Sequence, residues 1–238
     1  MRTIGLIGGL SPQSTAHYYE WINDGVRERL GGLNGASMII ASVNQQEITD
    51  LREESRWPEV AEILSGKARL LENAGADFVM IACNSVHHVA EKVEQALAIP
   101  FLHIADPTAA AMKKQGITCA GLLGTKYTMK MEFYRSRLKK YGIETVVPDD
   151  EGCSHINSII FGELCKGIVT DESRKDFIKI ARSLFDKGAQ GLILGCTEID
   201  MIIDQKDFEQ PVFDTTRLHI AKALAYSLGD TDILATAA

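Results

Sequence analysis

Short apolar segments alternate along this chain with longer segments in which apolar residues recur every three or four positions. Segments that are apolar almost throughout are typical of strands buried on both faces of a parallel sheet, and the longer pattern is typical of helices. In the first half we expect strands at 3–8, 38–43, 78–82 and 100–104. We expect helices at 12–30, 58–74 and 85–97 and from 106 onward, with a polar loop through Glu47 and Arg52. The first helix should turn Tyr19, Ile22, Val26 and Leu30 inward.

The second half of the chain repeats this order of elements. Strands are expected at 120–124, 145–147, 191–195 and 211–214, with a helix from Thr170 to Gly188. An internal duplication explains the repeat, and it predicts an α/β fold of two similar domains with mainly parallel sheets flanked by helices. The last helix, 214–228, follows the final strand and is expected to pack back on the first half. The predicted domains are therefore residues 1–105 with 213–238, and residues 106–212.

Two of the apolar segments end in a cysteine followed by small polar residues. Residues 78–82 lead into Cys83, Asn84 and Ser85, and residues 191–195 lead into Cys196 and Thr197. Ligands collect at the carboxyl ends of parallel strands, so both thiols are placed where chemistry is usually done. A matched pair favours a reaction that needs two equivalent groups on opposite faces of one substrate. Inversion of a carbon centre by two acid/base groups, in a cleft between the domains, meets that need.

Composition narrows the class of protein. The chain has 238 residues, of which 45% are hydrophobic and 24% charged, as in an ordinary globular protein. A net charge of −7 argues against nucleic-acid binding. The chain opens directly on a strand and contains no apolar stretch of about 18 residues, so we expect a cytoplasmic protein with no membrane partner. Five cysteines, with no CxxC or HExxH motif, favour a reducing compartment and no metal site.

Four turns of the chain resemble those of the aspartate/glutamate racemase family. They are Ile4-Gly5-Leu6-Ile7-Gly8-Gly9-Leu10-Ser11, Ala82-Cys83-Asn84-Ser85, Gly121-Leu122-Leu123-Gly124-Thr125 and Gly195-Cys196-Thr197-Glu198. The resemblance spans nearly the whole chain and is closest to the branch with broad glutamate and aspartate specificity. Ser85 stands where the family usually has threonine, and it keeps the hydroxyl group. Glu198, where glutamate racemases carry histidine, supports the aspartate-type branch.

The resemblance implies a racemase that works without pyridoxal phosphate or another cofactor. Cys83 and Cys196 would then be the two acid/base groups, one as thiolate and one as thiol, exchanging states with the other enantiomer. Cysteine suits both tasks because its pKa lies within about two units of neutrality. We also expect a helix N-terminus at Asn84 or Thr197 to lower the adjacent thiol pKa and to bind the α-carboxylate of the substrate.

The remaining candidate site residues would bind the substrate. Ser11, Asn84, Ser85 and Thr197 follow strand ends and suit the α-amino and α-carboxylate groups. Arg52 suits a distal carboxylate, since its guanidinium binds carboxylates in a bidentate fork. Thr125 follows the first strand of the second half, and by resemblance Lys166 lies near a position that aspartate enzymes use for substrate charge.

Each of these residues also has a structural interpretation. Ser11 precedes Pro12, and helix capping alone could explain it. Arg52 lies in a charged stretch that is more simply explained as solvated surface. His87 and His88 are better explained by packing than by catalysis. Three further cysteines read as core or unreactive thiols: Cys119, Cys153 and Cys165.

Other functions remain open at this point. By resemblance, the same architecture serves hydantoin racemases, maleate isomerases and arylmalonate decarboxylases, although the last class keeps one cysteine. A binding protein descended from a racemase is a non-enzymatic alternative. The expected partner is a small amino acid, with a dicarboxylic one favoured, and the resemblance leaves a homodimer open.

Overall fold

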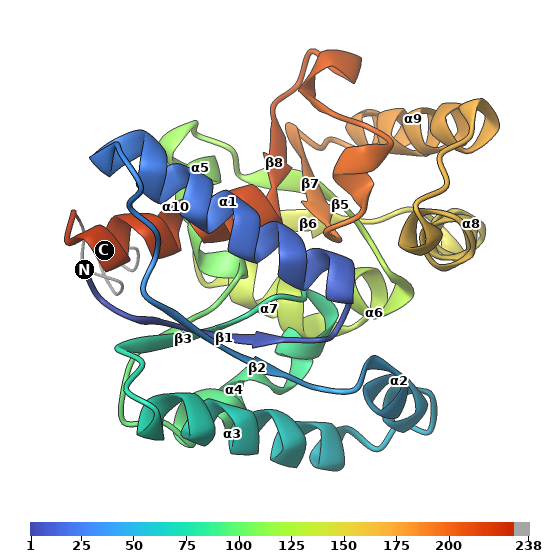
Figure 1. Cartoon of the computed structure of the whole chain (residues 1–238). Coiled ribbons are helices and arrows are strands. Elements are labelled where there is room, and N and C mark those ends of the chain that lie inside the picture. Colours follow the sequence, from blue (N-terminus) through green and yellow to red (C-terminus); the bar gives the residue numbers. More distant parts are fainter. Residues whose placement is uncertain (231–238) are drawn as a thin grey trace. The chain divides into compact units, whose positions relative to one another are not determined.

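The computed structural model describes residues 1–230, and packing divides the chain into two compact units (Figure 1). The first unit is Met1–Ile104 together with the segment that starts at His219, and the second is Ala105–Leu218. Each unit has a four-stranded parallel sheet flanked by helices, which confirms the predicted α/β fold class. Among the described residues, no helix has both the length and the apolar composition that crossing a bilayer requires.

The sheet of the first unit has the strand order β2-β1-β3-β4. Its strands are β1 (Ile4–Gly8), β2 (Met38–Ser42), β3 (Phe78–Ile81) and β4 (Phe101–Leu102). Its helices are α1 (Pro12–Leu30), α2 (Gln45–Glu53), α3 (Trp57–Asn73), the 3-10 helix η1 (Ser85–Val89) and α4 (Ala90–Gln95), and it also holds the larger part of α10 (Thr215–Leu228).

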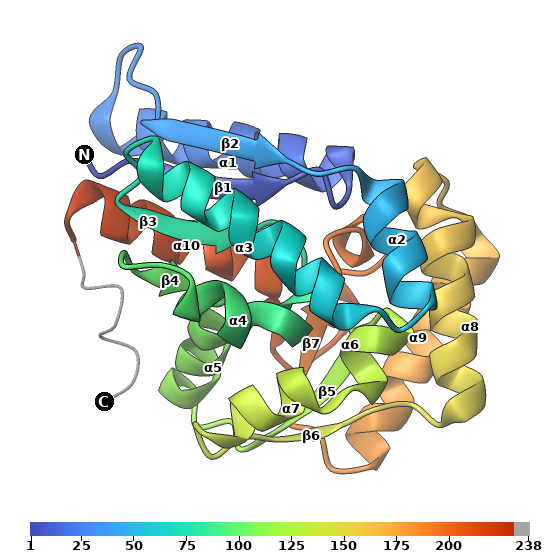
Figure 2. The same cartoon turned by 90° about the horizontal axis from the view of Figure 1, so that it is seen from below.

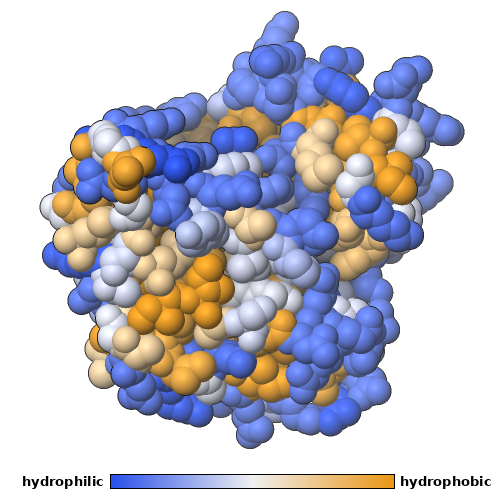
Figure 3. Space-filling view, viewed as in Figure 1, coloured by the Kyte–Doolittle hydropathy of each residue, from blue (hydrophilic) through white to orange (hydrophobic). Residues whose placement is uncertain are grey.

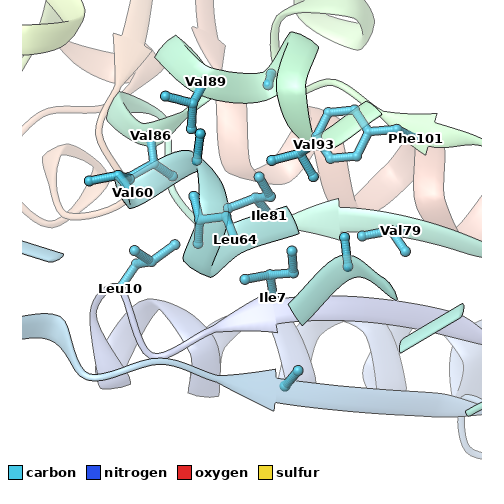
Figure 4. Close-up of a cluster of buried hydrophobic side chains, with 14 of the residues drawn as sticks. Ile7, Leu10, Val60, Leu64, Val79, Ile81, Val86, Val89, Val93 and Phe101 are labelled. Carbon is cyan, nitrogen blue, oxygen red and sulfur yellow. The ribbon is translucent and has the colours of Figure 1, made fainter. Parts of the chain in front are cut away.

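Helices cover both faces of this sheet, which explains why its central strands are apolar throughout. On one face, Ile7, Val79 and Ile81 pack against α3, η1 and α4, with Leu64 and Val86 among the contacts (Figure 4). On the other face the sheet is covered by α1 and α10 (Figure 2), and side chains of β1 and β3 belong to the same buried cluster as side chains of these helices. Successive strand residues point to opposite faces, so both sets must be apolar.

The second unit repeats the arrangement with the strand order β6-β5-β7-β8. Its strands are β5 (Cys119–Gly124), β6 (Glu144–Val146), β7 (Gly191–Gly195) and β8 (Val212–Asp214). Its helices are α5 (Ala105–Lys114), α6 (Lys126–Lys130), α7 (Glu132–Lys139), α8 (Asp150–Gly162), α9 (Asp171–Asp186) and the 3-10 helices η2 (Leu164–Lys166), η3 (Ile199–Met201) and η4 (Gln205–Asp207). Strands β3 and β7, which lead to Cys83 and Cys196, therefore occupy the same place in their sheets.

Some of the predicted elements need correction. Tyr19 and Leu30 were expected to face inward, but they are 53% and 50% exposed, and Tyr18 is buried instead. The buried stripe of α1 runs through residues 18, 22 and 26, a spacing of four that leaves Tyr19 on the flank. The predicted loop through Glu47 and Arg52 is helix α2, capped by the side chain of Asn44.

Two boundaries also differ from the expected ones. The helix expected over 85–97 is a 3-10 turn followed by the short helix α4. Residue 213, where the chain was expected to return to the first domain, still belongs to β8, which pairs with β7. Packing places the return at His219, inside α10.

The surface drawn in Figure 3 is mainly hydrophilic, with separate apolar patches. The exposed large apolar residues include Tyr19, Leu30, Leu33 and Ile40. Scattered apolar side chains of this kind are normal on protein surfaces.

Candidate functional site

The first candidate site lies at the carboxyl edge of the first sheet. Strands β1 and β3 are neighbours, with Ile7 opposite Ile81, so the turns that follow them begin side by side. The turn after β1 needs glycine at position 9, where φ is +79° and an added Cβ would lie 2.2 Å from Ser42 Oγ. This tight turn leads to Ser11, whose Oγ accepts the Ser14 N–H at 3.3 Å and caps α1. The expected helix cap at Ser11 is confirmed.

Cys83, at the end of β3, is linked to a buried arginine through Ser85. Cys83 Sγ lies 3.5 Å from Ser85 Oγ, and Arg52 Nη1 donates to the same Oγ at 2.9 Å. Ser85 Oγ accepts from Arg52, and it can still either donate its own hydrogen to the sulfur or accept one from the thiol. Arg52 Nη2 also donates to Thr49 Oγ1 at 3.3 Å. Arg52, Ser85 and Cys83 therefore lie together.

The interpretation of Arg52 as solvated surface is wrong, because this side chain is only 8% exposed. Helix α2 turns Ile48, Leu51 and Arg52 to its buried side. The neighbouring Arg56 stays exposed in ion pairs with Glu54 and Glu59, as the charged stretch suggested. Arg52 therefore contacts the turn that follows Cys83, and Arg56 lies on the surface.

Cys196, at the end of β7, has an acidic partner. Its Sγ donates to Glu198 Oε2 at 2.9 Å, and Thr197 Oγ1 donates to the same oxygen at 2.7 Å. Glu198 is 8% exposed. Burial, together with the negative charge of Glu198, raises the pKa of the Cys196 thiol well above its usual value. Cys196 is therefore held as a thiol at neutral pH.

This result overturns the expected effect of a helix N-terminus on Cys196. The chain after Thr197 forms only η3, three residues long and starting at Ile199. A helix dipole needs several aligned peptide units, so this turn cannot offset the burial of the thiol and the adjacent carboxylate. The turn after Cys83 is likewise a 3-10 helix, with buried Asn84 at its start.

The other two candidates differ in their placement. Thr125 is buried and follows β5, whose Gly124 pairs with Gly195 of β7, so Thr125 and Cys196 follow paired residues. Its Oγ1 lies 3.5 Å from Thr128 Oγ1. Lys166 is exposed at the end of η2, and strand pairing does not bring it to the Cys196 turn.

Glu198 belongs to this site, although the sequence indicated it only as a mark of the family branch. Its position two residues after the cysteine was the available signal, because a side chain at that spacing can turn back to the thiol. Of the remaining cysteines, Cys153 is buried in the core of the second unit, and Cys119 and Cys165 are partly exposed. Within residues 1–230, no group of three histidine, cysteine or acidic side chains is arranged to hold a metal ion.

Comparison with known proteins gives consistent similarities over both units. A model of the Asp/Glu/Hydantoin racemase family matches residues 7–223. The broad specificity amino-acid racemase RacX of Bacillus subtilis is 26% identical over 219 residues, covering 90% of this chain and 92% of RacX. A candidate Asp/Glu racemase from Yersinia pestis has a TM-score of 0.91 and 45% identity, covering 96% of this chain and 100% of its own. An aspartate racemase homologue from Pyrococcus horikoshii has a TM-score of 0.84 and 34% identity, with the same coverage of 96% and 100%.

Proposed function

The chain belongs to the Asp/Glu/Hydantoin racemase family, and we propose that it racemises a dicarboxylic amino acid, aspartate or glutamate, without a cofactor. In this proposal Cys83 and Cys196 move the α-proton. Each sulfur addresses one face of Cα in the proposed reaction.

The equivalent placement of the two cysteines is the observation that carries the proposal. Strands β3 and β7 hold the same position in sheets of the same strand order, and each is followed, within two residues, by a cysteine and then by residues with polar side chains. Two equivalent strand ends can present two equivalent acid/base groups, which is what inversion at Cα requires. A single nucleophilic cysteine would not need a duplicate at the matching position of the other sheet.

The environment of Cys196 supports an order for the two proton transfers. Because Cys196 is held as a thiol, it acts first as the acid, and Cys83 acts first as the base. Cys83 thiolate takes the α-proton, the Cα–H electron pair passes into the carboxylate as an enediolate, and Cys196 delivers its proton to the opposite face. The product is the other enantiomer, with Cys83 now a thiol and Cys196 a thiolate. The reverse reaction starts from this second form of the enzyme.

Arg52 supports a substrate with a distal carboxylate. Its guanidinium is buried, and it reaches Ser85, two residues from Cys83. A guanidinium in such a place can pair with a carboxylate in a fork, and an unpaired substrate charge there would be costly. We assign Arg52 to the side-chain carboxylate and the hydroxyl groups of Ser11, Ser85, Thr125 and Thr197, with Asn84, to the α-amino and α-carboxylate groups. We assign Lys166 only a long-range charge effect, since it is exposed.

Loss of optical activity tests the reaction itself. Circular dichroism of L-aspartate and L-glutamate should decay to zero with the purified protein, with no added cofactor and in the presence of a metal chelator. In D₂O the recovered amino acid should carry deuterium at Cα, because the proton that Cys196 delivers comes from solvent. Stable optical activity of both substrates would reject the proposal and leave a binding protein or a related isomerase.

Substitution of Arg52 tests the substrate class. Arg52→Gln should lower kcat/KM for aspartate and glutamate more than tenfold, because truncating one partner of a buried charge pair costs about 2–5 kcal/mol. A neutral amino acid such as homoserine should be spared. Arg56→Gln is the matched control, since Arg56 lies in the same segment but is exposed. Equal losses for acidic and neutral substrates would assign Arg52 a structural role.

The compartment is also part of the proposal. All five cysteines are free, and five is an odd number, which supports a reducing environment. We therefore place the enzyme in the cytoplasm.

A further inference from the structure

The histidine four residues after Cys83 contacts the backbone of the cysteine itself. His87 lies in η1 and is 2% exposed. Its Nδ1 is 2.7 Å from the carbonyl oxygen of Cys83, and its Nε2 accepts the backbone N–H of Ile104 at 3.3 Å. One imidazole ring thus joins the turn after β3 to the chain that leaves β4.

These two contacts determine where the ring proton lies. The Ile104 N–H can only donate, so Nε2 must be the nitrogen without a hydrogen. A neutral imidazole then carries its proton on Nδ1, and the Cys83 carbonyl, which can only accept, receives it. An imidazolium would direct a second N–H at the N–H of Ile104. The geometry therefore requires neutral His87 as the Nδ1–H tautomer.

In the second cysteine turn, the carbonyl of the cysteine receives its hydrogen bond from the backbone. The Cys196 carbonyl accepts the backbone N–H of Ile199 at 3.2 Å. The residue four positions after Cys196 is Asp200, whose carboxylate cannot donate a hydrogen bond. The cysteine carbonyl is therefore held by a side chain in the first turn and by the backbone in the second. Among the two turns, only that of Cys83 has a histidine in this role.

We propose that His87 is a positioning residue for Cys83, which it orients by holding the Cys83 carbonyl through Nδ1–H. The proposal rests on the function proposed above, in which Cys83 carries the α-proton. Fixing the carbonyl fixes the backbone from which Sγ projects, while Ser85 contacts the sulfur itself. A shift of about 1 Å in a reacting group can cost as much as 100-fold in rate, so a small movement of this turn matters.

Two conservative substitutions separate the two hydrogen bonds of His87. In His87→Asn the amide nitrogen can occupy the place of Nδ1 and still donate to the Cys83 carbonyl, while the contact with Ile104 is lost. In His87→Gln the amide oxygen can occupy the place of Nε2 and accept from Ile104, while the contact with Cys83 is lost. Each variant loses one hydrogen bond and is the control for the other.

The proposal predicts an unequal effect on turnover. For L-aspartate, kcat of His87→Asn should stay within about threefold of wild type, and kcat of His87→Gln should fall by about tenfold or more with little change in KM. Thermal unfolding midpoints of the two variants should be similar. Equal losses of kcat in both variants, or a greater loss in His87→Asn, would overturn the proposal.

A measurement on the wild-type protein tests the hydrogen bond even if a variant does not fold. Long-range ¹H–¹⁵N correlation spectra of protein labelled at histidine should show His87 as the Nδ1–H tautomer, which is the less common form in water. An Nε2–H tautomer would overturn the proposal. This test needs no substrate, so failure of the wild-type protein to racemise aspartate and glutamate would reject the proposed function and leave the state of His87 separately measured.

Discussion

Replacing Glu198 by glutamine isolates the effect of one carboxylate on the thiol of Cys196. Glu198 Oε2 lies 2.9 Å from Cys196 Sγ and 2.7 Å from Thr197 Oγ1. Glutamine has nearly the same size, and its amide oxygen can still accept from both groups. The substitution therefore removes a negative charge while it keeps the shape and the hydrogen-bond acceptor.

The size of the effect follows from Coulomb's law. Two unit charges about 4 Å apart repel by about 1 kcal/mol in water and by about 4 kcal/mol at an effective dielectric constant of 20. Removing this repulsion should therefore lower the pKa of Cys196, since about 1.4 kcal/mol corresponds to one pKa unit. Burial is the larger cause of the raised pKa, and it remains in the variant.

The rate of alkylation against pH reports this change directly. In a Cys83→Ser background, iodoacetamide should label Cys196 with a midpoint that moves to lower pH in Glu198→Gln, as measured by mass spectrometry of the Cys196 peptide. Glu144→Gln is the matched control, because Glu144 contributes to the raised pKa of Cys119. It should move the Cys119 midpoint and leave that of Cys196 in place. An unchanged Cys196 midpoint in Glu198→Gln would refute this account of the thiol.

The same substitution should alter the kinetics in a restricted way. The equilibrium constant of a racemisation is one, so kcat/KM must be equal in the two directions in any variant. A bias toward the Cys196 thiol can therefore appear only as a difference in kcat between the enantiomers, matched by an equal difference in KM. Glu198→Gln should bring the two kcat values closer together, and progress curves from each pure enantiomer would measure this.

Other predictions follow from the two sites and the core around them. Cys83→Ser and Cys196→Ser should each reduce racemisation below a tenth of wild type, because serine is too weak an acid and base at neutral pH; higher activity in either variant would contradict the two-cysteine mechanism. Burial lowers the pKa of His219 to about 3, so below about pH 6.5 the unfolded chain binds a proton that the folded protein does not. The unfolding free energy should therefore decrease by up to about 1.4 kcal/mol per pH unit between about pH 6.5 and about pH 3. Denaturant titrations of wild type and His219→Gln at several pH values should diverge over this range, and parallel curves would contradict it. The Cys196 thiol should contribute stability that is present below about pH 8.5 and lost at higher pH, which the same titrations on Cys196→Ser would check. Gly9→Ala should lower the thermal unfolding midpoint, because its Cβ would meet Val43 O at 2.3 Å.

The sequence by itself determined the architecture of this protein. Strands β1, β3 and β7 are apolar on both faces because helices cover both sides of each sheet, and that pattern is visible without coordinates. The duplicated order of elements predicted two sheets of the same kind, and the structure has them. The positions of Cys83 and Cys196 at strand ends follow from the same local pattern.

Tertiary structure decided the environment of each group. The charged segment around Arg52 reads as surface, and only the tertiary fold buries that residue beside Ser85. The pKa of Cys196 depends on burial and on how Glu198 turns back to the sulfur, and neither can be read from residue order. His87 acquires its tautomer from the N–H of Ile104, a residue 17 positions away that the sheet brings beside it. The local period of apolar residues predicts which face of a helix or strand is buried. The ionisation state, proton position and hydrogen bonds of a side chain depend on neighbours that are distant in sequence.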